Sequence, residues 1–380
     1  MELNELLKIA VDRKASDLHI KVGTPPVLRI DNRLIPLAEM PRLGQDLVVT
    51  MALGLMSPRQ RDRFKEHNEV DLAHSVPGLG RFRVSVFQQR GMVGMVLRLI
   101  PLKIQTFAEL SLPPVLESLA NEPRGLILVT GTTGSGKSST LSAMVDHINS
   151  TRSGHIITIE DPIEFLHRDK KCLVNQREVG VDTPSFGEAL RSALRQDPDV
   201  ILVGEMRDFE TISTAILAAE TGHLVMSTLH TVDATETVNR VISVFPPYQQ
   251  KQVRLQLAAV LKGIVSQRLI ARADEKGRVP AVEVCICTAT VREHIVDPDK
   301  TRKLHDVIAA GVSQYGMQTF DQSLMTLYTR GLITYEEALH WCSNPDDFAL
   351  RVRGIESTAD STWGRTSEEP PKTIPGMTRL

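Results

Sequence analysis

The sequence predicts an α/β protein in which an N-terminal α+β domain precedes an open α/β domain built on a parallel sheet. Three observations support this fold class. The chain has 380 residues, which is too long for one ordinary domain. Its first hundred residues mix a helical pattern with short alternating strands. From Arg124 onward, continuously apolar runs alternate with helical segments, as in a parallel sheet covered on both faces.

The N-terminal domain, residues 1–100, contains one predicted helix and several predicted strands. Residues 2–11 carry leucine and isoleucine at helical spacing, whereas later segments alternate between polar and apolar residues. Asp31 and Asn32 indicate a turn between two of these strands. The strands are predicted over residues 17–20, 27–30, 34–35, 81–87 and 92–100.

The second predicted domain covers residues 124–350. Residues 185–196 form a predicted helix with one apolar stripe, and Ser185 with Glu188 fits a capping box at its start. Three or four further helices are predicted over residues 249–349. The apolar strands are predicted over residues 126–129, 156–159, 200–203 and 224–226.

Two segments lie outside these domains. Residues 101–123 contain the pair Pro113-Pro114 and predict a linker with a short helix. Residues 351–380 are rich in serine, threonine, proline and charge, so we expect a flexible tail there.

Composition argues against several classes of protein. Hydrophobic residues make up 42% of the chain and charged residues 24%, a balance typical of soluble globular proteins. No apolar run approaches the roughly 20 residues of a membrane-spanning helix, and the first residues do not resemble a secretory signal. We therefore expect a cytosolic protein with no direct membrane span. The formal net charge of −2 argues against nucleic acid as a partner.

The cysteines do not suggest a metal site. None of the four belongs to a C-x-x-C pair, and Cys285 and Cys287 lie inside an apolar stretch. We expect buried thiols in a reducing compartment. The four are Cys172, Cys285, Cys287 and Cys342.

Residues 131–138 match the phosphate-loop pattern G-x-x-x-x-G-K-[S/T] between an apolar strand and a helical stretch. Glycines let backbone amides converge on phosphates at a helix N-terminus. Lys137 is expected to reach the β- and γ-phosphates of ATP, and the Ser138 hydroxyl to bind Mg²⁺. The predicted nucleotide-binding residues are Gly131, Thr132, Thr133, Gly134, Ser135, Gly136, Lys137, Ser138 and Ser139.

Acidic residues follow two of the predicted strands, where open α/β sheets bind their ligands. Glu205 ends the run that begins with the strand at residues 200–203. Glu160, Asp161 and Glu164 follow the strand at residues 156–159. A single acidic residue of this kind is a solvated loop charge about as often as it is a functional group. Two acidic strand ends beside a phosphate loop favour ATP hydrolysis.

Two histidines, His223 and His230, flank the predicted strand at residues 224–229. A lone histidine at such a place is more often a satisfied rim residue. The pair nevertheless suggests that at least one of them senses the γ-phosphate or an adjoining subunit.

Taken together, these motifs make the chain similar to the secretion-ATPase superfamily, and within it to the branch of type IV pilus retraction (twitching motility) ATPases. The resemblance covers about residues 1–350 and follows the family's order of motifs. The matching segments are residues 15–20, 80–83, 131–138, 159–165, 197–208, 219–230 and 317–322.

The resemblance implies a homohexameric ring of subunits, each with an N-terminal PAS-like domain and a RecA-like ATPase domain. It implies a cytoplasmic motor, peripheral at the inner-membrane face of the pilus machine, that uses ATP and Mg²⁺. Its expected partners are an inner-membrane pilus platform protein and a second retraction ATPase. By the same resemblance, Glu164 activates the attacking water, and Glu205 takes the Walker B position near Mg²⁺ and water. The residues alone do not decide which glutamate is the general base.

Arg81 and Arg83 are two residues apart on an alternating strand, which places both side chains on one face, with Phe82 turned into the domain. From periodicity alone, a solvated basic edge is the more frequent explanation. The resemblance instead implies that both arginines lie over the nucleotide when the two domains close.

One segment departs from the retraction branch. Residues 290–297 keep the arginine and the isoleucine of that branch's A-I-R-N-L-I-R-E helix but little else. This leaves open an accessory retraction ATPase. A pilus-assembly or type II secretion ATPase shares most motifs, but that branch usually has a longer N-terminal region and a four-cysteine motif. A nucleotide-gated scaffold and a DNA-translocating relative are the remaining alternatives.

Overall fold

The computed structural model describes residues 2–30, 33–100 and 103–354. The turn predicted at Asp31 and Asn32 and most of the predicted tail lie outside these residues. The chain divides into an N-terminal unit, residues 1–103 with 164–166, and a C-terminal unit formed by the rest. No helix in the described ranges has the length and apolar character needed to cross a membrane.

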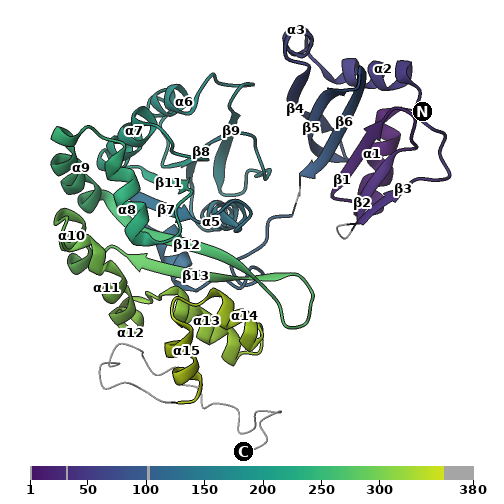
Figure 1. The fold of residues 1–380 in the computed structure, drawn as a ribbon. Helices are drawn as coiled ribbons and strands as arrows, with labels where there is room; N and C mark the ends of the chain where they lie inside the picture. Colours follow the sequence, from purple (N-terminus) through teal and green to yellow (C-terminus); the bar gives the residue numbers. More distant parts are fainter. Residues whose placement is uncertain (1, 31–32, 101–102, 355–380) are drawn as a thin grey trace, which may run out of the picture. The chain divides into compact units, whose positions relative to one another are not determined.

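The N-terminal unit is a six-stranded antiparallel sheet in the order β3-β2-β1-β6-β5-β4, with three helices beside it (Figure 1). All five strands predicted here from alternation are confirmed. Helices α2 and α3 and strand β4 were not predicted, and α3 buries only Phe64, so it has no apolar stripe to detect. The elements are α1 (Leu3–Asp12), β1 (Asp17–Lys21), β2 (Val27–Ile30), β3 (Arg33–Pro36), α2 (Gln45–Leu55), α3 (Pro58–His67), β4 (Glu69–Val76), β5 (Gly80–Gln89) and β6 (Met92–Ile100).

The C-terminal unit is a seven-stranded sheet in the order β13-β12-β7-β11-β10-β8-β9. Every neighbouring pair is parallel except β12 and β13, which form an antiparallel hairpin. The first part of this unit contains α4 (Val115–Ala120), β7 (Gly125–Thr130), α5 (Lys137–Thr151), β8 (Gly154–Glu160), β9 (Cys172–Glu178), α6 (Phe186–Ala193), β10 (Val200–Val203), α7 (Phe209–Glu220), β11 (Leu224–Leu229) and α8 (Ala234–Ser243). The second part contains α9 (Pro247–Val260), β12 (Leu261–Ala271), β13 (Arg278–Ile286), α10 (Ala289–Val296), the 3-10 turn η1 (Thr301–Lys303), α11 (Leu304–Ala310), α12 (Val312–Tyr315), α13 (Phe320–Thr329), α14 (Tyr335–Trp341) and α15 (Pro345–Val352).

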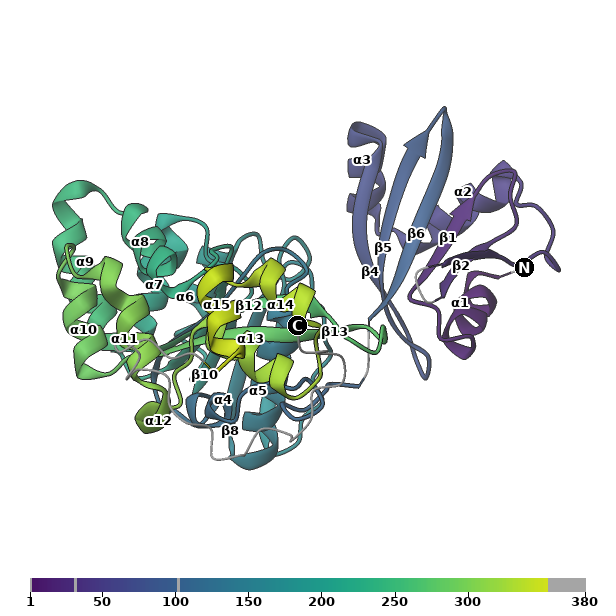
Figure 2. The ribbon, with the colours of Figure 1, turned by 60° about the horizontal axis from the view of Figure 1, so that its bottom comes forward.

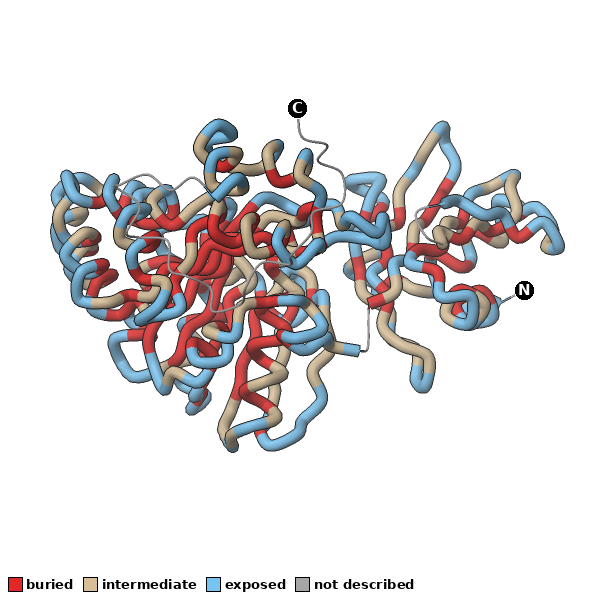
Figure 3. Tube along the Cα trace, turned by 90° about the horizontal axis from the view of Figure 1, so that it is seen from below, coloured by how far each residue is buried: buried red, intermediate tan, exposed pale blue. Residues whose placement is uncertain are grey.

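Helices cover both faces of this sheet. Apolar residues of α6 to α11 pack on one face, against strand residues such as Leu128 and Ile201. Helices α4 and α5 pack on the other face, against residues such as Ile127 and Val200. A separate cluster joins α13, α14 and α15 to the β12–β13 hairpin, over which they lie in Figure 2. Buried residues accordingly run along the strands in Figure 3.

The sheet confirms the parallel strands predicted from continuously apolar runs and corrects one prediction. Residues 249–349 hold not only helices but also the two long strands β12 and β13, and more helices than the three or four expected. The predicted α/β fold class is confirmed, whereas the PAS-like assignment of the N-terminal unit stays a prediction. Helix α15 ends at Val352, so the predicted tail boundary at residue 351 falls in its last turn.

Local sequence signals explain several helix ends. Ser185 Oγ accepts a hydrogen bond from Glu188 N at 3.2 Å, so Ser185 caps α6 as predicted. The helix itself ends at Ala193, three residues before the predicted end. The four cysteines are free thiols, and all but the partly exposed Cys342 are buried.

Candidate nucleotide site

The phosphate loop connects the end of β7 to the start of α5, as the motif predicts. Gly131 has φ 143°, and a Cβ atom there would meet the Gln267 carbonyl oxygen at 2.5 Å. Gly136 caps α5 with φ 95°, in the left-handed region that glycine tolerates best. The loop therefore requires glycine at these two positions, because one packs against β12 and the other turns the chain into the helix.

Lys137 is the first residue of α5 and is 8% exposed. Its Nζ donates hydrogen bonds to the carbonyl oxygens of Gly131 and Thr132, both at 2.9 Å. The ammonium group is thus held against the loop at the N-terminus of a 15-residue helix, where backbone N–H groups and the helix dipole favour anions.

The other predicted loop residues differ in exposure. Thr132, Thr133 and Gly134 are exposed, whereas Ser135 is buried. Ser138 and Ser139 in the first turn of α5 are partly buried. The loop is therefore exposed at its middle residues, with Ser138 partly buried at the helix terminus beside them.

Glu205 follows β10, and His230 follows β11, the neighbouring strand. His230 Nε2 lies 3.1 Å from Glu205 Oε1. The two strands are also joined by a hydrogen bond from Ser227 Oγ to the Val203 carbonyl oxygen, 24 residues away in the sequence. Arg207 Nε also donates to Glu205 Oε1, and this hydrogen bond raises the pKa of Arg207. Glu205 is only 18% exposed, so its carboxylate is held between a histidine and an arginine.

A cleft of about 570 Å³ brings these motifs together. Thr133 of the phosphate loop lines it beside Glu205 and His230. The common location follows from topology, because the parallel strands β7, β10 and β11 all end at the same edge of the sheet. Its lining residues are Thr133, Glu205, Met206, Arg207, Leu229, His230, Thr231, Glu236 and Arg240.

His223 does not reach this cleft within the subunit. It precedes β11, and its carbonyl oxygen accepts a hydrogen bond from Gly125 N at the start of β7. The phosphate loop begins at the other end of β7, roughly 17 Å away for a strand of this length. His223 Nδ1 instead contacts the Ala218 carbonyl oxygen at 2.9 Å. Of the two predicted histidines, the structure therefore brings only His230 to the nucleotide side.

The acidic segment after β8 is anchored to β9. Glu160 Oε1 accepts hydrogen bonds from Thr158 Oγ1 at 2.6 Å and Gln176 Nε2 at 3.1 Å. The backbone N–H of Ile163 donates to the buried Glu178 at 3.3 Å. Glu164 comes next and is exposed. Because residues 164–166 are grouped with the N-terminal unit, the role of Glu164 stays a prediction.

Arg81 and Arg83 lie on β5 of the N-terminal unit. Phe82 between them is 1% exposed, as predicted for the inward side of the strand. Arg83 is exposed and lies 4.0 Å from Asp71 on β4, and Arg81 is partly buried. Their predicted role over the nucleotide stays a prediction.

The donor set suits Mg²⁺ that arrives with a nucleotide. Among the described residues, no group of three or more His, Cys, Asp and Glu side chains could hold a metal. Mg²⁺ does not need one, because it commonly takes one or two protein oxygens together with phosphate oxygens and water. Ser138 and Glu205 carry hard oxygen atoms of this kind.

Several residues of the site were not predicted. Arg207 carried a sequence signal, since it stands two positions after Glu205 in the same motif. Glu236 and Arg240 on α8 line the cleft but belong to no motif. Gln267 on β12 donates from Nε2 to Thr140 Oγ1 at 2.9 Å and so supports the first turns of α5. Only the spatial neighbourhood of the phosphate loop identifies it.

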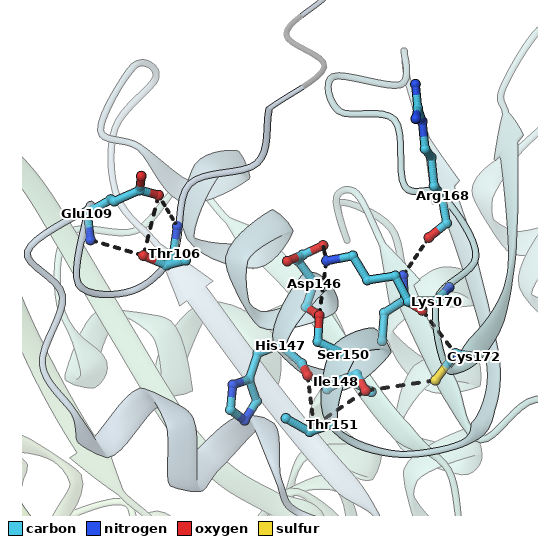
Figure 4. A network of polar contacts seen from close by, with 11 residues as sticks. Thr106, Glu109, Asp146, His147, Ile148, Ser150, Thr151, Arg168, Lys170 and Cys172 are labelled. Atoms are coloured by element: carbon cyan, nitrogen blue, oxygen red, sulfur yellow. Dashed lines mark hydrogen bonds and ion pairs between the residues drawn. The ribbon is translucent and has the colours of Figure 1, made fainter.

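The far end of α5 binds the segment that returns from the acidic loop (Figure 4). Lys170 Nζ contacts Asp146 Oδ1 at 2.7 Å and Ser150 Oγ at 3.0 Å. The buried Asn149 donates to the Arg168 carbonyl oxygen at 2.7 Å. One helix therefore carries the phosphate loop at its start and fixes residues 168–172 at its end.

Comparison with known proteins agrees with this geometry. Residues 2–318 match the model of the family described as type II/IV secretion system protein. The chain is 47% identical to the type IV pilus retractation ATPase PilT of Pseudomonas aeruginosa, over 92% of this chain and 100% of that protein. It is 44% identical to the type IV pilus ATPase PilU of the same organism, over 95% of this chain and 94% of that protein.

A solved structure gives the same result. The crystal structure of the pilus retraction motor PilT with bound ADP superposes with a TM-score of 0.85 at 47% identity, covering 91% of this chain and 98% of that one. The predicted resemblance to the retraction ATPases is thereby confirmed. The chain belongs to the family of type II/IV secretion system proteins.

Proposed function

We propose that this chain is an ATPase that powers the retraction of type IV pili as one subunit of a homohexameric ring. The observation that carries the proposal is the cleft at which the phosphate loop, Glu205 and His230 meet. Such a site supplies what phosphoryl transfer needs, namely positioning and electrostatic stabilisation. The 47% identity to PilT supports pilus retraction as the work that hydrolysis drives.

In this proposal Lys137 and Ser138 bind ATP at the start of α5. The Lys137 ammonium moves from the loop carbonyls to the β- and γ-phosphates and offsets their charge. Ser138 and Glu205 hold Mg²⁺, which supplies charge stabilisation to the phosphates. The ADP bound in the PilT structure supports nucleotide binding by this chain.

The remaining roles follow the family resemblance. Glu164 is the proposed base that activates the attacking water, while Glu205, held by His230 and Arg207, orients the water and the metal. Arg81 and Arg83 are proposed to cover the γ-phosphate when the domains close, so that hydrolysis requires closure. His230 reports the state of the γ-phosphate through its contact with Glu205.

The proposed setting is the cytoplasmic, inner-membrane face of the pilus machine, with the platform protein as partner. A second possibility is that the chain is an accessory ATPase that works beside another retraction motor, and the 44% identity to the type IV pilus ATPase PilU shows that more than one pilus ATPase resembles this chain. A pilus-assembly ATPase, a type II secretion ATPase and a nucleotide-gated scaffold are the alternatives that the test below separates.

Two measurements test the proposal. Phosphate release by the purified ring, with and without single-stranded DNA, should give Mg²⁺-dependent hydrolysis that DNA does not stimulate. A deletion strain should carry long, static pili and lose twitching. Absent pili would indicate an assembly motor, and unchanged pili with slow retraction would indicate the accessory ATPase. A ring that binds ATP but releases no phosphate would be a scaffold.

A further inference from the structure

Glu283 is a buried carboxylate in the C-terminal unit that no motif of the site includes. It lies on β13 and is 3% exposed. Burial raises the pKa of Glu283 to about 7, and the neighbouring Asp233 acts in the same direction while Arg268 opposes it. Burying a carboxyl group costs free energy that an apolar residue at this position would avoid, so the contacts of Glu283 call for an explanation.

One set of contacts joins Glu283 to the base of the phosphate loop. Its Oε1 accepts a hydrogen bond from Ser266 Oγ on β12 at 3.4 Å. Ser266 Oγ in turn accepts one from Thr130 Oγ1 at 3.0 Å. Thr130 is the last residue of β7, directly before Gly131, and both hydroxyl residues are fully buried.

The other contact joins Glu283 to the segment that carries His230. The same Oε1 accepts from the backbone N–H of Ala234, the first residue of α8, at 2.8 Å. Only three residues separate Ala234 from His230, whose Nε2 is 3.1 Å from Glu205. Residues 230–234, here called the histidine loop, are therefore tied to the carboxylate at one end.

Further hydrogen bonds make the histidine loop rigid between these two points. Thr231 Oγ1 and Thr237 Oγ1 lie 2.7 Å apart, and Val232 N donates to Glu236 Oε2 at 2.8 Å. A displacement of Ala234 therefore moves His230 with it. One oxygen atom of Glu283 thus fixes the spacing between the base of the phosphate loop and the histidine that holds Glu205.

We propose that Glu283 is a positioning residue for ATP hydrolysis, which sets the histidine loop at a fixed distance from the phosphate loop. This inference rests on the proposed function. Glu283 touches neither nucleotide nor metal. It acts on the chemical step through His230 and Glu205, so its loss affects turnover more than nucleotide binding.

The test compares Glu283→Leu and Glu283→Gln with Val284→Ala. Val284 is the next residue of β13, is fully buried, and has its side chain on the opposite face of the strand. We expect E283L to lower kcat at least tenfold with less than a threefold change in KM for ATP. E283Q should restore at least a third of wild-type kcat, because its amide oxygen still accepts from Ala234 N. V284A should have a lower melting temperature than the wild type, but its kcat should stay within twofold of the wild-type value.

A second variant removes the contact from the other side. Ala234→Pro deletes the N–H that donates to Glu283, and the proline ring fills the space that the carboxylate oxygen occupied, so the contact is lost at the first position of α8. The preceding Asp233 is already extended, with φ −153° and ψ 176°, as a residue before proline must be. A234P should match E283L in kcat, and it replaces E283L if that variant does not fold.

Hydrogen exchange separates this inference from the proposed function. In the wild-type ring the amides of the histidine loop should exchange slowly. They should exchange at least tenfold faster in E283L and A234P, and at the wild-type rate in V284A. This readout needs no turnover, so a wild type that fails to hydrolyse ATP overturns the proposed function and not the positioning role. The inference is overturned if the amides of the histidine loop exchange at the same rate in E283L as in V284A. It is also overturned if the loss of kcat in E283L is no larger than that in V284A.

Discussion

His230 Nε2 lies 3.1 Å from Glu205 Oε1, which joins the ends of two adjacent parallel strands across the candidate nucleotide site. A histidine in this place limits the orientations that the glutamate can adopt. Arg207 contacts the same oxygen, so Glu205 is held from two sides.

His230→Ala should lower kcat about tenfold or more, because a hydrogen bond to a charged group is worth about 1.5–3 kcal/mol. The KM for ATP should change little, since Lys137 supplies most of the phosphate contact. His223→Ala, at the opposite end of β11, should stay near the wild-type rate. Equal losses for the two variants would show that His223 reaches an active site in the assembled ring.

Lys137→Ala should abolish measurable hydrolysis and weaken ATP and ADP binding, because the phosphates lose their buried cationic partner. Nucleotide affinity is measured by calorimetry and phosphate release by a coupled assay. A matched surface variant is Lys171→Ala, whose exposed lysine lies outside the cleft. Turnover by K137A within tenfold of wild type would remove Lys137 from the mechanism.

Glu164→Gln and Glu205→Gln separate the two candidate glutamates. Loss of a general base should lower kcat about 10²–10⁴-fold, with nucleotide binding kept because size and shape are retained. The residue whose replacement causes the larger loss in single-turnover hydrolysis is the base. Near-normal turnover in either variant excludes that residue from catalysis.

Arg81→Ala and Arg83→Ala should each lower ATP turnover at least about tenfold, with ring assembly intact, since an added arginine can supply about 10³–10⁵ in rate. Arg→Lys should rescue poorly, because the forked geometry of the guanidinium is lost. Arg59→Ala on the exposed helix α3 controls for surface charge. Wild-type rates in both Arg81→Ala and Arg83→Ala would leave the solvated basic edge as the explanation.

The pH dependence of stability should report Glu283. Its pKa is raised from 4.5 to about 7, so the folded chain keeps a proton that the unfolded chain has released. The contribution of Glu283 to the stability of the folded chain should therefore fall as pH rises from about 4.5 to about 7, by about 3 kcal/mol in all. Glu283→Gln should lack this slope, and the difference between the two melting curves from pH 5 to pH 8 measures it. Parallel curves would show that Glu283 does not titrate in this range.

The sequence was informative wherever a signal is local. The apolar run at residues 126–129 predicted β7, and the phosphate-loop pattern predicted the turn into α5, because each depends on neighbouring residues only. The β12–β13 hairpin was missed for a physical reason. Ser266 and Gln267 interrupt the apolar pattern of β12, and in the fold they are buried and hydrogen-bonded to Thr130 and Thr140, which lie 136 and 127 residues away.

The same contrast between local sequence signals and contacts of distant residues holds for the candidate site. Glu205 was predictable as a carboxylate at a strand end, but its contact with His230 depends on the order of strands in the sheet. The separation of His223 from the cleft follows from strand direction, because His223 precedes β11 whereas the ligand site lies at the carboxyl ends of the parallel strands. Glu236 and Arg240 reach the cleft through the placement of α8, which no motif encodes.

The carbonyl oxygens of the phosphate loop compete with a bound phosphate for the Lys137 ammonium group. An ammonium group has three N–H donors, and the carbonyl oxygens of Gly131 and Thr132 accept two of these bonds at 2.9 Å. A phosphate that binds Lys137 competes with these acceptors for the ammonium hydrogens. This competition limits affinity and speeds emptying of the site. In the ring proposed above, a subunit whose site empties sooner can bind its next ATP sooner.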